Sequence, residues 1–444
     1  MARTAELVLA HGVGGGRDLP IPSEYAVVGA GWALVISFTV MAFAWRSSRF
    51  RGDDSGRALP AWAGALAGAV WTHALLRALA LAFTALFLVA LLLGPDRLTN
   101  PAFGMFYVLI WVGIVPASLL LGPIWRLVSP VRLLHAGLAR LLRTDPDAGL
   151  ARMPEWVGYW PASLGLLSFV WVELVYPQST YLASVRAWVG LYAAILLLGS
   201  MLFGRVWFAR ADPFEVFSSL VARLSPFARR TDGALVLRNP LENLDALRPE
   251  PGLVAVVAVL FGSTGFDSFG ESPFWTSYAQ SLPLDAVLLD TAALLGFVLA
   301  VGMTFGLATM AVGGLGHIER RLLPRTFAHS VVPIIVGYFV AHYLTLLFET
   351  GQQTLAQMSD PMGTGADLLG TADMGVSFFL TLHPTGLAVT KVVAVVVGHL
   401  LGAVSAHDRA VRVLPRGREL VGQLPLLLVM VLYTSTGLYL LLAA

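Results

Sequence analysis

Apolar runs of about 20 residues alternate with short polar segments along the whole chain. A run of this length crosses the ~30 Å hydrocarbon layer of a bilayer as an α-helix. The pattern predicts ten spans, with the sixth and ninth the least regular, at about residues 25–45, 75–94, 104–125, 157–176, 187–204, 251–266, 285–311, 331–350, 386–404 and 424–443. We therefore expect an all-α integral membrane protein, a bundle of about ten transmembrane helices.

The composition agrees with this class, because 57% of the residues are hydrophobic and 13% are charged. No segment is long or polar enough for a separate soluble domain, so residues 1–444 are predicted to form one membrane domain with the lipid bilayer as its partner. Nucleic acid is not an expected partner. There is no cysteine, which excludes disulfides and thiolate metal sites. A metal would have to bind through His, Asp, Glu or Met.

Arginines give the orientation, because short loops rich in Lys and Arg stay cytoplasmic. Most of the 29 basic residues fall in five alternate loops: Arg46 to Arg57, Arg126 to Arg152, Arg205 to Arg248, Arg320 to Arg325, and Arg409 to Arg418. The opposite segments hold only Arg3, Arg17, Arg97 and Arg186. The sequence thus predicts a multi-pass membrane protein with both termini extracytoplasmic.

Four segments between spans have predicted roles. Residues 1–24 form an extracytoplasmic tail whose start is too short and too weakly apolar for a secretory signal. Residues 126–155 form a cytoplasmic loop in which 126–143 alternates arginines and leucines, as an interfacial helix does. The cytoplasmic loop 205–250 contains several prolines and is expected to hold short helices and turns. Residues 351–385 form an extracytoplasmic loop.

The eighth span carries polar residues at helical spacing. Tyr338, His342, Thr345, Glu349 and Gln353 follow one another at steps of four, three, four and four. These steps place them on one stripe of an α-helix, which must face protein or water rather than lipid. The stripe is a candidate wall of a site or passage open to the outside.

The ninth span holds Lys391, His399 and, at its cytoplasmic end, His407. Lys391 is the one lysine of the chain, and Glu349 or an outside aspartate is its expected partner. His342 and His399 on neighbouring helices form a candidate ligand pair for haem or copper, because imidazole suits both. The alternative is that both histidines are buried and hydrogen-bonded between helices. His407 is expected to be an interfacial residue, with a metal ligand as the alternative.

Residues 261–275, "FGSTGFDSFGESPFW", crowd glycines, hydroxyls and acids at the outer end of the sixth span. Such a composition favours a broken or re-entrant segment lined by protein, with an ordinary outside loop as the alternative. Asp267 is its candidate ligand, proton acceptor or partner of Lys391. Glu173, one turn inside the outer end of the fourth span, is a further candidate for a proton or ion path.

Two outer segments complete the candidates. Asp360, Asp367 and Asp373 make the outer face acidic, either to attract cations or as a solvated loop. His11, beside glycines in "AHGVGGGRDLPIP", could chelate copper only after removal of the ten residues before it.

Several stretches resemble a bacterial multi-pass membrane-protein family named fenitrothion hydrolase. They include "LGPIWRLVSPVRLL", "WPASLGLLSFVWVELVYP", "STGFDSFGESPFW", "SVVPIIVGYFVAHYLTLLFETGQ" and "VVVGHLLGAVSAH", and they cover most of the chain in order. The family name implies hydrolysis of an organophosphate ester. The sequence contains neither G-x-S-x-G nor H-E-x-x-H, the patterns expected of a serine or metal hydrolase.

Four functions remain open from the sequence. The first is a redox or metal-binding membrane protein with a membrane redox or assembly partner, whose His342 and His399 are ligands. The second is a transporter of a cation, proton or small solute, with Glu349, Asp267 and Lys391 along its path. The third is the hydrolase implied by the resemblance, and the fourth is a structural or assembly subunit.

Overall fold

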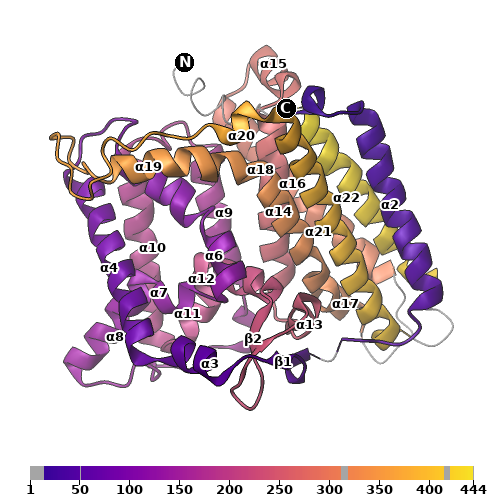
Figure 1. The fold of residues 1–444 in the computed structure, drawn as a ribbon, viewed down its shortest axis with the longest axis horizontal. Helices are drawn as coiled ribbons and strands as arrows, with labels where there is room; N and C mark the ends of the chain where they lie inside the picture. Colours follow the sequence, from indigo (N-terminus) through magenta and orange to yellow (C-terminus); the bar gives the residue numbers. More distant parts are fainter. Residues whose placement is uncertain (1–14, 51, 312–318, 415–420, 444) are drawn as a thin grey trace. The chain divides into compact units, whose positions relative to one another are not determined.

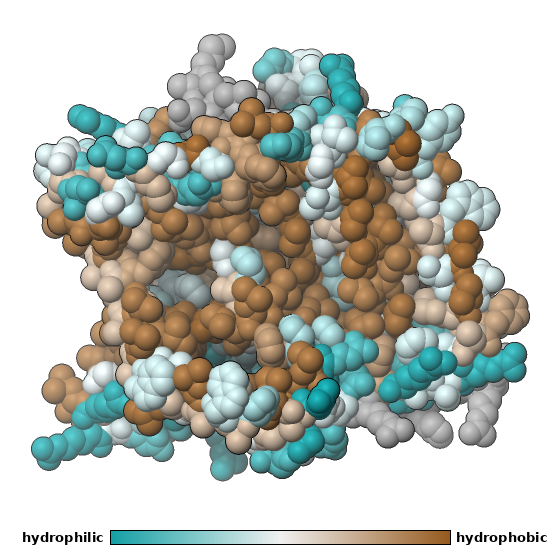
Figure 2. All heavy atoms as spheres, viewed as in Figure 1, coloured by the Kyte–Doolittle hydropathy of each residue, from teal (hydrophilic) through white to brown (hydrophobic). Residues whose placement is uncertain are grey.

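A computed structural model describes residues 15–50, 52–311, 319–414 and 421–443 (Figure 1). Within them, nine helices are long and apolar enough to cross a membrane, and a bent pair, Pro101–Ile110 with Ile114–Leu121, makes a tenth span if counted as one. Figure 2 shows apolar side chains along the middle of the helices and polar ones toward their ends. The predicted all-α membrane fold is confirmed. The least regular predicted spans, the sixth and ninth, are both present.

The contacts within the chain divide it into two compact units. Unit 1 comprises residues 1–52, 244–348 and 378–444, and unit 2 comprises residues 53–243 and 349–377. The pattern of spans could not reveal this division, because it depends on which helices pack together.

Unit 1 contains six long helices: α2 (Ser23–Ala44), α14 (Leu253–Gly270), α16 (Ala286–Ala311), α18 (Val332–Thr345), α21 (Pro384–Val413) and α22 (Leu424–Ala443). Its short elements are η1 (Gly16–Asp18), α15 (Pro273–Ser281), η6 (Arg320–Leu322), α17 (Leu323–Phe327), η7 (Ala328–Val331), α20 (Phe379–Leu382) and η9 (Val421–Gln423). Helix α18 packs on α21 and α14, α14 on α16, and α2 on α21 and α22. Helices α14 and α18 are the most buried of these spans, so polar side chains on them face protein.

Three glycines let α18 and α21 approach closely. An added Cβ at Gly337 would lie 2.4 Å from the Ala394 carbonyl oxygen, and one at Gly398 would lie 2.6 Å from the Pro333 carbonyl oxygen. Gly402, four residues beyond Gly398, is equally tight against α18 and η7. Small residues at such spacing bring helix backbones together in membranes, where van der Waals packing drives association.

One end of unit 1 gathers loops that are far apart in the sequence. Asp408 accepts hydrogen bonds from Trp45 Nε1, Ser48 Oγ and the Arg49 amide. Asp245 pairs with Arg409 and Arg412 at 2.9 and 2.5 Å. These segments belong to three of the arginine-rich loops, so their predicted placement on one side of the membrane agrees with the contacts within this unit.

Unit 2 contains α4 (Val70–Leu93), the bent span of α5 (Pro101–Phe103), η3 (Gly104–Ile110) and α6 (Ile114–Leu121), and then α9 (Trp160–Leu174) and α10 (Leu182–Phe203). Its short helices are η2 (Gly52–Asp54), α3 (Ala61–Gly68), α7 (Trp125–Val128), α8 (Pro130–Leu142), η4 (Glu155–Val157), α11 (Val206–Ala211), α12 (Pro213–Val221), η5 (Ala222–Leu224) and α19 (Gly351–Gln357). Helix α13 (Pro240–Asp245) and the π-helical turn η8 (Leu346–Thr350) cross the boundaries between the units. The bent span turns by 43°, after the π-helical η3.

A small antiparallel sheet joins two of the predicted cytoplasmic loops. Strand β3 (Leu235–Leu237) lies between β1 (Arg57–Ala58) and β2 (Phe227–Arg229), with Val236 opposite both Ala58 and Ala228. The prediction of short helices and turns over 205–250 therefore missed two strands. Two or three residues are too few to show a strand periodicity.

The irregularity predicted for 261–275 is confined to two residues. Helix α14 continues to Gly270, and the chain breaks only at 271–272 before α15, so 261–270 is neither broken nor re-entrant. Gly262 sits in the helix because α16 passes close by, with the Val298 Cα 2.7 Å from an added Cβ. The predicted interfacial helix over 126–143 is likewise divided at Ser129, whose side chain caps α8.

Candidate functional site

The polar centre of unit 1 is a contact between α14 and α18. Asp267 Oδ2 lies 2.9 Å from His342 Nε2 and accepts a hydrogen bond of 2.6 Å from the Tyr343 hydroxyl. The side chains of Asp267 and His342 are 10% and 5% exposed. A carboxylate and an imidazole in such surroundings are costly unless they pair, which is why each lies against the other.

Two hydroxyl groups continue the contact on the other side of the imidazole. Ser268 Oγ lies 3.2 Å from His342 Nδ1 and 2.8 Å from the Tyr338 hydroxyl oxygen. Tyr338 and His342 are one helical turn apart, and their rings stack with centroids 6.2 Å apart. Carboxylate, imidazole and two hydroxyls therefore form one chain of hydrogen bonds. We call these side chains the Asp267–His342 network.

Every link in this network can exchange a proton. Serine and tyrosine hydroxyls both donate and accept, and a histidine ring nitrogen donates or accepts according to its tautomer. Asp267 lies one turn before the end of α14, and Tyr338 lies at the middle of α18. The network thus runs inward from near the end of the span.

The predicted stripe on the eighth span stops beyond His342. Residues Leu346–Thr350 form the π-helical turn η8, which adds a residue to the turn and rotates the rest of the helix about its axis. Glu349 is buried and Gln353 is exposed, and both belong to unit 2. Thr345 is buried in the last turn of α18. The structure therefore brings Tyr338 and His342 into the network, whereas the Thr345 hydroxyl makes no hydrogen bond to it.

Asp267, an expected partner of Lys391, lies with His342 rather than with the lysine. Lys391 is buried on α21, and the carboxylate whose charge acts on it is Asp18 of η1. Helix η1 packs on α21 and α22, which brings the start of the described chain to this end of the unit. The charge of an aspartate in the predicted outer tail thus acts on Lys391.

His399 and His407 occupy other levels of α21. Gly337 meets α21 between Ala394 and Gly398. At ~1.5 Å per residue, His342 and His399 lie on opposite sides of this level, so the two imidazoles differ in depth by roughly 10 Å. His407 is buried near the end of α21, within 3.0 Å of Gln423 Oε1 and of the Trp45 carbonyl oxygen. It joins segments of the chain at that end.

The difference in depth between the two imidazoles does not favour a haem or a copper ion shared by His342 and His399. Both ring nitrogens of His342 already lie against Asp267 and Ser268. Nδ1 of His399 lies 2.8 Å from the Val395 carbonyl oxygen of its own helix. Among the described residues, no group of three or more His, Cys, Asp or Glu side chains could hold a metal ion. His11 lies outside the described residues.

A second polar cluster lies in unit 2, and the pattern of polar residues in the sequence did not reveal it. Asp212 accepts hydrogen bonds from Trp125 Nε1 (2.9 Å), the Tyr192 hydroxyl (3.0 Å) and the amides of Phe214 and Glu215. Glu215 receives two hydrogen bonds from Arg132, at 3.0 and 2.8 Å. Both carboxylates are almost fully buried. We call this the Asp212–Glu215 cluster.

A signal for this cluster was present in the sequence. Asp212, Pro213 and Glu215 stand at the N-cap, first and third positions of α12, which are preferred positions for these residues. Burial, and then the charge of Glu215, raises the pKa of Asp212 to about 7. The backbone and indole hydrogen bonds oppose that rise. The arrangement fixes α7, α8, α10 and α12 to one another.

The remaining acidic candidates lie in unit 2. Glu173 is half-buried in the last turn of α9. Asp360 accepts from the amides of Thr364 and Gly365, and Asp367 accepts from the Ala372 amide. These two aspartates stabilise turns of the segment 358–372, as aspartates of a solvated loop commonly do. Asp373 is exposed.

Comparison with protein-family models, with curated proteins and with solved structures gives no match. The function must therefore be argued from the geometry of this multi-pass membrane protein.

Proposed function

We propose that the protein is a membrane transporter in which the Asp267–His342 network takes up and releases a proton as a cation or small solute moves. The observation that carries this proposal is the 2.9 Å contact between Asp267 Oδ2 and His342 Nε2 inside the helices of unit 1. Ionisable groups at such positions in membrane proteins commonly mark proton relays and ion paths.

The charge balance of the pair supports proton binding. With a neutral imidazole and an ionised carboxylate, the pair carries one negative charge. Uptake of one proton gives a neutral pair, whichever of the two groups holds it, and a neutral pair is less costly in a low-dielectric interior. Tyr343, which donates to the same Oδ2, stabilises the ionised carboxylate and so works in the opposite direction. A site with these two opposing influences can alternate between a protonated and a deprotonated state.

Infrared titration of the purified protein tests proton binding directly. We expect the wild type to show a pH-dependent protonated-carboxyl band that is absent in Asp267→Asn and is separate from the band of Asp212, which Asp212→Asn removes. Proteoliposomes with an internal pH dye should show proton flux driven by a membrane potential, and His342→Ala should abolish it. His383→Ala is the matched control, because His383 is exposed and its Nδ1 lies 2.8 Å from the Phe379 carbonyl oxygen, away from the network. A carboxyl spectrum unchanged by Asp267→Asn, or a flux that survives in this variant, would contradict the proposal.

One observation favours a second candidate, the ester hydrolysis implied by the family resemblance. Ser268, His342 and Asp267 contact one another in the order of a nucleophile, a base and the carboxylate that orients the base. Ser268 is buried and also contacts Tyr338, so a substrate would have to displace that hydroxyl.

Ser268→Ala separates the two functions. A hydrolase should lose all turnover of an aryl phosphotriester probe, while its carboxyl titration persists. A transporter should show no turnover of that probe even in the wild type.

A further inference from the structure

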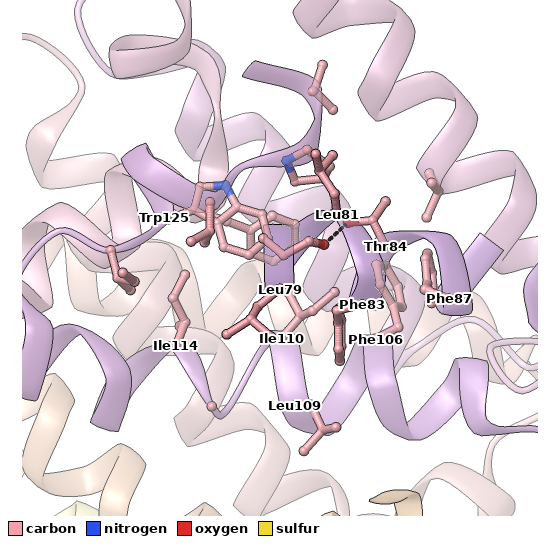
Figure 3. A pocket seen from close by; sticks show the side chains of 18 of the residues that line it. Leu79, Leu81, Phe83, Thr84, Phe87, Phe106, Leu109, Ile110, Ile114 and Trp125 are labelled. Carbon is pink, nitrogen blue, oxygen red and sulfur yellow. Dashed lines mark hydrogen bonds between the residues drawn. The ribbon is translucent and has the colours of Figure 1, made fainter. Parts of the chain in front are cut away.

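Unit 2 contains a cavity of about 610 Å³ that the proposed function does not use (Figure 3). Helices α4, η3, α6 and α10 form its walls, and α7 and α8 contribute Trp125, Pro130 and Val131 at one end. The volume falls within the ~300–1,000 Å³ range of ligand pockets. Figure 3 shows Leu79, Phe83, Phe106 and Ile110 among the side chains that line it.

The polar side chains of the lining are already paired within the wall. The Thr84 hydroxyl donates to the Ala80 carbonyl, Trp188 Nε1 to Ser168 Oγ, and Trp125 and Tyr192 to Asp212. The other lining residues are apolar. A polar ligand would lose its hydrogen bonds to water and find few in return, whereas a hydrocarbon chain would lose none.

The cavity opens at the surface of the spanning helices. Leu79, Leu121 and Leu134 line it and are 58%, 62% and 51% exposed. In a bilayer, the space beside such helices is filled by lipid chains. A chain can therefore enter from the side without crossing water.

The α7–α8 end of the cavity is basic. Arg126 directly follows the lining residue Trp125, and its side chain is 58% exposed. Arg140 and Arg143 are exposed farther along α8. Burial, and then the charges of Arg132 and Arg205, lowers the pKa of His135 on the same helix. Exposed arginines beside an apolar cavity suit a negatively charged headgroup above a hydrocarbon chain.

We propose that this cavity binds one acyl chain of an anionic phospholipid, with the phosphate beside Arg126. Three features select this ligand: the apolar lining, the opening toward the lipid and the positive charge at one end. A soluble organic ligand would meet none of the hydrogen-bond donors that fix the orientation of such ligands.

The experiment uses the full chain in vesicles that contain a phospholipid with a photoreactive diazirine on one acyl chain. After illumination and digestion, mass spectrometry should find the label on the α4 peptide that contains Phe83 and Phe87. Ala193→Phe places a phenyl ring in the cavity and should lower this labelling about tenfold, a loss of about 1.4 kcal/mol in binding. Ala117→Phe fills the cavity from α6 and repeats the test if Ala193→Phe does not fold.

Leu198→Phe is the matched control, because Leu198 lies on α10 as Ala193 does, is 67% exposed and does not line the cavity. Equal labelling in Ala193→Phe and Leu198→Phe would overturn the cavity as the binding site, since the label would then come from the general lipid belt.

The headgroup is tested with the same diazirine chain on phosphatidylglycerol and on phosphatidylcholine. One arginine near a membrane surface is worth roughly a fivefold preference for the anionic lipid. Arg126→Gln should remove that preference and leave the labelling by phosphatidylcholine unchanged. Equal labelling by both lipids in the wild type would overturn the anionic headgroup.

Discussion

Both units bury an aspartate beside a tyrosine hydroxyl, yet the two sites differ in what surrounds the carboxylate. Asp212 begins α12 and accepts from two backbone amides and an indole, none of which gives up its proton. Asp267 stands within α14, and its neighbours are a histidine and a tyrosine. Fixed donors make a carboxylate a structural anchor, whereas titratable neighbours allow protons to move. The two aspartates therefore differ in the groups that hydrogen-bond to them more than in how deeply they are buried.

The largest effect should come from breaking the anchor in unit 2. Arg132→Met removes the two hydrogen bonds that neutralise the buried Glu215 and should cost about 3–5 kcal/mol of stability. Arg126→Met, the control, removes one longer contact of 3.3 Å from an exposed side chain and should cost about 1 kcal/mol or less. Melting temperatures in detergent measure both. Similar losses would mean that Glu215 does not depend on Arg132.

The pH dependence of stability should expose the raised pKa of Asp212. Its folded-state pKa of about 7 exceeds the usual 3.8, so the folded protein holds a proton that the unfolded chain has released. Stability should therefore fall as pH rises from about 4 to 7, by at most about 4 kcal/mol, and level off above 7. Asp212→Asn lacks this proton. The same decline in Asp212→Asn and wild type would show that another group causes it.

The close approach of α18 and α21, which holds His342 in place, should be sensitive to a single methyl group. Gly337→Ala would put a Cβ 2.4 Å from the Ala394 carbonyl oxygen and should cost about 1–3 kcal/mol. Gly296→Ala on α16 is the control, because an added Cβ there meets nothing within 4 Å. Thermal unfolding of the two variants gives the difference. If Gly337→Ala and Gly296→Ala have the same melting temperature, α18 and α21 can move apart without loss of stability.

The smallest effect on stability should come from the proposed proton site. Asp267→Asn keeps the shape and an acceptor oxygen for Tyr343, so it should change the unfolding free energy by about 1 kcal/mol or less. The same variant should lose the carboxyl titration. A large drop in melting temperature would instead place Asp267 with Asp212 as an anchor and would remove the distinction between the two units.

The sequence predicted the spans because each needs only length and apolar character. It also placed Tyr338 and His342 on one helix face and selected Asp267 and Lys391, because ionisable residues stand out in apolar runs. An outside aspartate was expected to act on Lys391, but the sequence could not show that it is Asp18, because this depends on the packing of η1 on α21 and α22. The π-helical turn at Leu346–Thr350 has no counterpart in hydrophobic periodicity, so spacing alone could not extend the stripe from His342 to Glu349.

The interleaving of the two units constrains how the protein is made. The chain leaves unit 1 at residue 52, returns at 244, leaves again at 348 and returns at 378. Helix α2 emerges from the ribosome before the other described spans, and the helices it packs on, α21 and α22, emerge after them. Since synthesis proceeds at about 5–20 residues per second, α2 must wait in the membrane until the remaining spans are inserted. No single cut of the polypeptide can release either unit intact.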